Sequence, residues 1–271
     1  MTLLHWLMID ILHYSFFQNA LLGSLLAAIV CGIVGTYIVT RRLVFISGGI
    51  THASFGGIGL GVLLGVNPVF SAMIFAVLSA FGVEWMARRN VREDSAIAVF
   101  WTFGMSVGII CCFLTPGFMP DLPSFLFGSI LTIGSLDLWL LAVLCVIVAV
   151  CITVFYREIL SVAFDRTFAE SQGLPVRWIE YGMMALVALT IVSTLRMVGI
   201  VLAISLLTIP QMTANLFTFT YKRMMLLSVL IGWVDCLFGL AMSYWLDVPS
   251  GASIIFVSII GYAVAKLSVR K

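Results

Sequence analysis

The chain contains no charged residue between Arg42 and Glu84. A stretch of that length can cross a bilayer twice, because one helical crossing needs about 20 apolar residues. Similar apolar stretches recur along the sequence, and only 10% of all residues are charged, against about 25% in soluble domains. The sequence therefore predicts an all-α, polytopic membrane helical bundle. No segment is long enough for a separate soluble domain, so residues 1–271 are expected to form one transmembrane domain.

About nine membrane-spanning helices are predicted from these apolar stretches. They cover residues 20–40, 45–65, 69–87, 96–114, 136–156, 178–195, 198–217, 224–245 and 251–267. With this division all but Arg196 of the 14 basic residues fall on one side of the membrane. The positive-inside rule makes that side cytoplasmic, so the N-terminus is expected outside and the C-terminus in the cytoplasm.

The first 19 residues carry no Lys or Arg, so they lack the basic n-region of a cleavable signal peptide. Residues 1–19 are predicted to be an interfacial N-terminal segment, with His5 and His13 as interfacial polar residues. A second short apolar piece, 125–131, lies in the long outer connection 115–135 and is expected to be re-entrant or interfacial. The six cysteines lie in apolar spans without a CxxC motif, which predicts packing rather than disulfides.

The main cytoplasmic connection covers residues 157–177 and contains a predicted short helix. Asp165 can cap its start, and Gly173 can close it. Phe164 and Phe168 are four residues apart, so they are expected on one helix face. An exposed aromatic pair outside the membrane favours a protein partner. The alternative is an amphipathic helix that rests on the bilayer surface.

His52 is the only histidine within the predicted spans, and it lies among glycines. Helical spacing puts Gly48, Gly56 and Gly59 on the same face as His52, and glycines allow membrane helices to approach closely. A neutral imidazole can bind transition metals or relay protons. A structural histidine, hydrogen-bonded to a neighbouring helix, remains the alternative from spacing alone.

Asp235 is the second polar outlier, since it lies in the middle of the eighth predicted span. A carboxylate at that depth costs about 2.5–3.5 kcal/mol, so its side chain should face protein or water. It could be an oxygen ligand for a metal, or it could hold its helix against a neighbour. At the cytoplasmic ends of helices, Glu84 with Arg88 and Arg177 with Glu180 are expected to form surface pairs.

Several signatures of catalysis are absent from the sequence. It contains no GxxxxGK[ST] and no HExxH, which are the marks of P-loop ATP binding and zinc proteolysis. The chain is therefore not expected to be an enzyme or to bind ATP itself.

Ordered segments of the sequence resemble the permease subunits of ATP-binding-cassette importers for zinc, manganese and iron. The similarity runs from about residue 20 to 267. It rests on the basic pair at 41–42 with the Thr-His-Ala stretch at 51–53, the acidic helix start at 93–97, the outer segment 126–131, the cytoplasmic helix 165–175, the Pro-containing span 198–210 and the Asp-Val-Pro-Ser-Gly-Ala stretch at 247–252.

The resemblance implies a homodimeric pore in the cytoplasmic membrane, with ATP bound by a separate cytoplasmic ATPase subunit and metal delivered by an extracytoplasmic metal-binding protein. Membrane lipid is the remaining partner, and no nucleic acid is expected. The chain would bind no cofactor of its own, since the divalent metal is cargo. The residues implied in coupling to the ATPase are Phe164, Asp165, Phe168, Ala169 and Gly173.

His52 corresponds to a family position that contacts the passing metal. Family members often carry Asp four residues earlier, where this chain has Gly48. Either the metal is softer, or Asp235 or another helix supplies the oxygen ligand, or the substrate differs. Alternative functions are a siderophore- or cobalamin-type chelate importer and a proton-coupled secondary transporter. Zinc, manganese and iron remain open as cargo.

Overall fold

A computed structural model describes residues 15–115 and 133–269, and the regular elements within these ranges are all α-helices. Nine stretches in the described ranges are long and apolar enough to cross a membrane. The predicted all-α bundle and its nine spans are therefore confirmed. Residues 1–14 and the short outer piece 125–131 lie outside the described ranges, as do His5 and His13.

The helices follow one another with short connections, except across residues 115–134. Their bounds are α2 Ser15–Thr40, α3 Val44–Leu64, α4 Pro68–Ala87, α5 Glu93–Leu114, α7 Ser135–Val154, α8 Tyr156–Phe164, α9 Arg166–Ser171, α10 Val176–Leu206, α11 Ile209–Phe217, α12 Tyr221–Leu246 and α13 Ser250–Val269.

The turn between α3 and α4 shows why the helix ends fall where they do. Gly65 ends α3 in the left-handed conformation, with φ of 69°, which glycine adopts without a steric penalty. The side chain of Asn67 then accepts a hydrogen bond of 2.9 Å from the Val69 amide, and Pro68 occupies the first turn of α4. Both choices are typical of helix starts.

The sixth and seventh predicted spans correspond to Val176–Leu195 and Met197–Phe217 in the structure. The helix α10 continues past this division to Leu206, and its backbone leaves helical geometry at Gly199, where φ is 77°. A second break precedes Pro210 in α11.

Gln211 stabilises the second break. Its buried amide Nε2 donates hydrogen bonds to the carbonyl oxygens of Leu206, at 3.0 Å, and Cys31, at 2.8 Å. A carbonyl left free where a helix ends inside a membrane must find a donor within the protein. The bond to Cys31 also ties α11 to α2.

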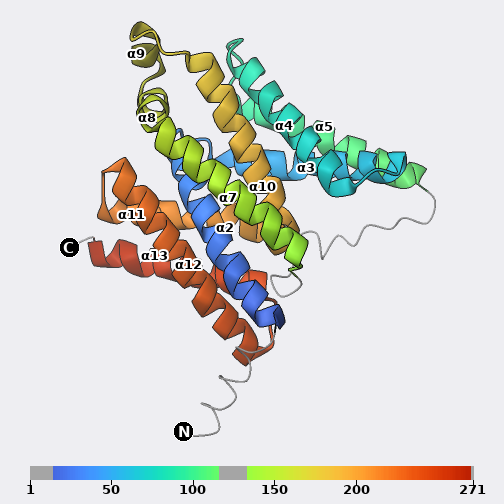
Figure 1. The fold of residues 1–271 in the computed structure, drawn as a ribbon, viewed down its shortest axis with the longest axis vertical. Helices are drawn as coiled ribbons and strands as arrows, with labels where there is room; N and C mark the ends of the chain where they lie inside the picture. The colour runs from blue at the N-terminus through green and yellow to red at the C-terminus, as the bar shows by residue number, and fades with distance from the viewer. Residues whose placement is uncertain (1–14, 116–132, 270–271) are drawn as a thin grey trace, which may run out of the picture.

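The helices α2 and α10 lie between the other helices of the bundle (Figure 1). α2 packs on α7, α10 and α12, and α10 packs on α3 and α4 as well. The group α3–α4–α5 lies on one side of this centre, and α11–α12–α13 lies on the other. The short helices α8 and α9 lie together at one end of the molecule, which places the predicted coupling segment away from the bundle centre.

Candidate functional site

His52 lies on α3 and is half-buried against α5. Its imidazole ring stacks on the indole of Trp101, with ring centroids 4.4 Å apart and planes 9° apart. Stacking uses the faces of the imidazole, whereas a metal binds the in-plane lone pair of a ring nitrogen. The contact therefore orients the ring without using its metal-binding electrons.

The glycines that share the face of His52 pack α3 closely on α5. A Cβ atom at Gly56 would lie 2.7 Å from the carbonyl oxygen of Gly104, and one at Gly59 would lie 2.7 Å from that of Gly108. Such distances leave no room for a side chain, as in other small-residue contacts between membrane helices. These glycines allow the backbones of α3 and α5 to touch.

Gly48 differs from the other glycines on this face. A Cβ atom there would meet the Trp101 ring at 3.5 Å and the Ile204 side chain at 3.7 Å, which are ordinary van der Waals distances. The absence of a carboxylate at this position is thus not forced by crowding around the β-carbon.

Asp235 is buried on α12, facing α13. Its Oδ1 lies 3.7 Å from the position that a Cβ of Gly261 would take. Its Oδ2 and the hydroxyl of Ser258 are buried without a well-formed hydrogen bond among the described residues. The carboxylate thus faces a neighbouring helix, and its role as a metal ligand or as a helix contact stays a prediction.

His52 and Asp235 lie on helices with different neighbours. α3 packs mainly on α4, α5 and α10, whereas α12 packs on α2, α11 and α13. Within the described ranges no group of three or more His, Cys, Asp or Glu side chains could hold a metal ion. The described residues of one chain therefore do not bring three such ligands together.

The predicted cytoplasmic helix is present as α9, with the expected ends. Asp165 caps it, because its carboxylate accepts a hydrogen bond of 2.9 Å from the Phe168 amide. This bond lowers the pKa of the Asp165 carboxyl below its ordinary value. After the helix, Gly173 takes a φ of 74°, the left-handed conformation common past helix ends.

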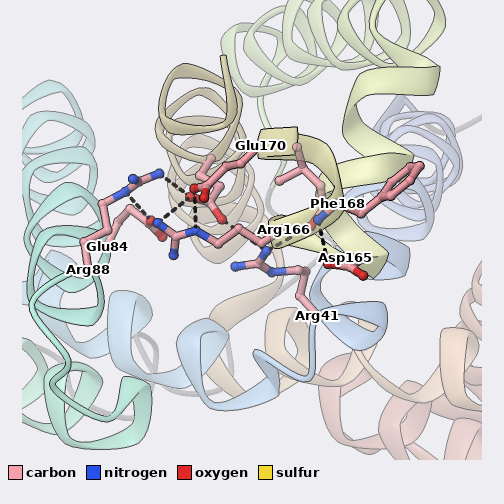
Figure 2. Close-up of polar contacts among 9 residues, drawn as sticks. Arg41, Glu84, Arg88, Asp165, Arg166, Phe168 and Glu170 are labelled. Carbon is pink, nitrogen blue, oxygen red and sulfur yellow. Dashed lines mark hydrogen bonds and ion pairs between the residues drawn. The ribbon is translucent and has the colours of Figure 1, made fainter. Parts of the chain in front are cut away.

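α9 is anchored on one face and exposed on the other. Ala169 is fully buried, in a small apolar cluster with Val162 and Val176. Phe168 is 55% exposed and points away from the arginines of the neighbouring charge cluster (Figure 2). Phe164, also exposed, ends α8 rather than belonging to α9, because the extended backbone of Asp165 separates the two helices. The two phenylalanines thus do not share one helix face.

A buried charge cluster joins α9 to three other helices. Glu180, at the start of α10, is fully buried and forms ion pairs with Arg41 at 3.2 Å, with Arg166 at 3.8 Å, and with Arg88. Arg88 also pairs with Glu84 at 2.9 Å. The labelled members of the cluster come together from separate helices in Figure 2.

The predicted surface pairs differ from this arrangement. Glu84 does pair with Arg88, but Glu84 is only 2% exposed. The Arg177 guanidinium lies over the Tyr181 ring instead of meeting Glu180, because the α10 helix directs Glu180 into the bundle. The sequence shows that these charges lie at helix ends on one side of the membrane. Which of them form ion pairs depends on tertiary packing.

Comparison with known proteins gives this geometry a context. The model of the ABC 3 transport family matches residues 13–268. An uncharacterized membrane protein of Synechocystis sp. is 40% identical over 259 residues, which cover 95% of this chain and 92% of the relative.

A further relative carries a functional name, and a solved structure shares the fold. The manganese transport system membrane protein MntC of Listeria monocytogenes is 32% identical over 262 residues, covering 96% of this chain and 93% of the relative. The solved structure of PsaBC from Streptococcus pneumoniae in complex with Fab is similar with a TM-score of 0.84 and 28% identity. That similarity covers 95% of this chain and 93% of the other.

Proposed function

The chain belongs to the ABC 3 transport family, and from that premise we propose that it is the multi-pass permease subunit of an ATP-binding-cassette importer for divalent metal ions. The match over residues 13–268, together with relatives named as manganese transport proteins, carries this conclusion. Among zinc, manganese and iron we therefore propose manganese as the first cargo to test.

ATP hydrolysis belongs to a separate cytoplasmic subunit, and α9 is the proposed contact with it. The helix is held at its buried Ala169 and presents Phe168 to the outside. An exposed aromatic side chain on a rigid, capped helix provides an anchor for a protein groove. On the opposite side of the membrane, an extracytoplasmic metal-binding protein would deliver the ion.

His52 is the proposed ligand on the metal path, and a homodimer would complete its site. A single imidazole is one ligand, while Mn²⁺ and Zn²⁺ take four or more in proteins. A second copy of the chain would contribute a second His52. Asp235 could add a carboxylate oxygen, which suits manganese, only if the dimer brings α12 near α3.

The proposed orientation places α9 in the cytoplasm. If the nine spans cross the membrane alternately, the basic residues of the described ranges other than Arg196 fall near span ends on the side of α9, and the positive-inside rule assigns that side to the cytoplasm. The N-terminus would then lie outside, and lipid would contact the exposed apolar side chains. The chain itself would hold no cofactor.

The direct test is uptake by the complete importer in proteoliposomes. The purified complex of permease, ATPase and binding protein should take up radioactive manganese when ATP is supplied. Uptake that depends on a proton gradient instead of ATP would favour a secondary transporter. ATP-driven uptake of an intact siderophore or cobalamin, but not of free manganese, zinc or iron, would favour a chelate importer.

A further inference from the structure

Glu180 is a buried carboxylate that collects positive charges from separate parts of the chain. Arg41 follows the end of α2, Arg88 follows the end of α4, and Arg166 is the first residue of α9. All three pair with Glu180, whose side chain is 0% exposed. A buried carboxylate without such partners would be strongly destabilising, so the position of Glu180 depends on these arginines.

The three arginines are not equally buried. The side chains of Arg41 and Arg88 are 13% and 19% exposed, whereas that of Arg166 is 38% exposed. Arg41 is held further by a hydrogen bond of 3.1 Å to the Val162 carbonyl oxygen in α8. Arg166 also pairs with Glu170, at 3.3 Å, within its own helix. The cluster is thus more buried on the bundle side, at Arg41 and Arg88, than on the side of α9, at Arg166.

The cluster leads from α9 to the helix that carries His52. Arg41 lies three residues before Val44, where α3 begins. Arg88 belongs to the end of α4, which packs along α3. A displacement of Arg166 would change the balance of charge at Glu180, and both remaining arginines sit at helix ends adjoining α3.

We propose that Glu180 is a positioning residue for transport, through which a movement of α9 is passed to the ends of α2 and α4 and from there to α3. Arg166 is the movable contact, while Arg41 and Arg88 are the fixed ones. This inference rests on the proposed function, since it takes ATP hydrolysis in a partner subunit as the source of the movement. The competing view is a static brace that only holds the helix ends together.

The test measures how many manganese ions enter per ATP hydrolysed by the reconstituted importer. Arg166→Gln removes the contact from α9 and leaves Glu180 paired with Arg41 and Arg88. Glu180→Gln removes the centre of the cluster at nearly constant shape. Arg157→Gln, an exposed arginine of α8, is the matched control. Co-purification of the ATPase is measured for every variant.

We expect Arg166→Gln to lower the number of ions per ATP about fivefold or more, which is the fold-change that a typical coupling between two sites produces. Binding of the ATPase should be retained. The double variant Arg166→Gln/Glu180→Gln should lose no more ions per ATP than the more impaired of the two single variants, because both substitutions break the same contact. Arg157→Gln should keep the wild-type ratio. A static brace predicts lower thermal stability and a wild-type ratio.

An unchanged ratio in Arg166→Gln, or losses that multiply in the double variant, would overturn the inference. If Glu180→Gln fails to assemble, the ratio in Arg166→Gln decides, because that variant keeps the buried pairs. A wild-type complex without ATP-driven metal uptake would instead overturn the proposed function. The two failures are therefore distinguishable in one experiment.

Discussion

The imidazole of His52 lies flat on the indole of Trp101, with 4.4 Å between the ring centroids. The two residues come from α3 and α5, whose backbones approach closely at glycines along the same face. The half-buried histidine is thus held by a neighbouring helix, and its ring orientation is set by an aromatic contact. A ligand with a fixed orientation loses less conformational entropy when it binds an ion.

Replacing Trp101 with Leu should weaken metal transport at low metal concentration. Without the stacked ring, His52 can sample other rotamers, so its capture of the ion becomes less favourable. We expect a KM for manganese uptake raised about tenfold, by analogy with the loss of groups that orient metal ligands, with the maximal rate largely kept. Uptake by the reconstituted importer over a range of manganese concentrations measures both quantities.

Phe103→Leu is the matched control for that change. Phe103 is also on α5, but its ring stacks on Phe75 of α4 rather than on His52. It should leave the KM near its wild-type value. Equal shifts in the Trp101 and Phe103 variants would mean that aromatic packing of α5 in general, and not the contact with His52, sets the affinity.

Introducing Asp at position 48 should strengthen metal binding. The residue would lie one helical turn from His52, which places a carboxylate and an imidazole on one face, and its β-carbon has room beside Trp101 and Ile204. We expect a lower KM for manganese, with slower turnover if release becomes limiting. A Gly48→Asn variant, without the charge, should show a smaller change. An unaltered KM in Gly48→Asp would argue that position 48 does not face the metal path.

Gly56→Ala should destabilise the contact between α3 and α5. The added methyl group would meet the Gly104 backbone, and overpacking of this kind costs about 1–3 kcal/mol. Gly182→Ala is the control, because nothing lies within 4 Å of a Cβ there. Thermal unfolding in detergent should show a lower midpoint for Gly56→Ala alone. Equal midpoints for both variants would contradict the close packing described for Gly56.

Asp165→Ala should weaken binding of the ATPase subunit, because α9 loses the acceptor for the Phe168 amide. Asp165→Asn keeps an acceptor and should bind nearly as well. The pKa of Asp165 is below its ordinary value. The stabilisation by its charge is therefore complete at any pH above the ordinary pKa, and it is lost only as the pH falls through the lowered pKa. ATPase binding should therefore not vary between pH 6 and 8 through this group. Co-purification of the ATPase measures binding for both variants. An equal loss of binding in Asp165→Ala and Asp165→Asn would contradict the capping role.

Much of the fold followed from the sequence, because a bilayer restricts each crossing to one type of element. The apolar runs defined nine spans, and the described residues contain nine helical stretches that can cross a membrane. The division between the sixth and seventh spans was also predicted, but the bend at Gly199 was not. A glycine inside an apolar run is compatible with a straight membrane helix, so its positive φ is decided by packing and not by local sequence.

The functional residues could be predicted from the sequence to different degrees. Asp165 and Gly173 carry local signals for the ends of α9, and both positions are confirmed as helix ends. The partners of Glu180 could not be foreseen, since Arg41 and Arg88 are 139 and 92 residues away along the chain. Trp101 was missed for the same reason, because an apolar aromatic in a span has no feature that marks it as a neighbour of a histidine.

The most direct measurement is ATP-driven manganese uptake by an assembled importer that carries His52→Ala. We expect uptake to fall about tenfold or more at limiting metal, with the ATPase and the binding protein still associated. The His52→Gln complex should take up little more manganese than the His52→Ala complex, because an amide is a weaker metal ligand than an imidazole. Wild-type uptake by the assembled His52→Ala complex would contradict the claim that this histidine lies on the metal path.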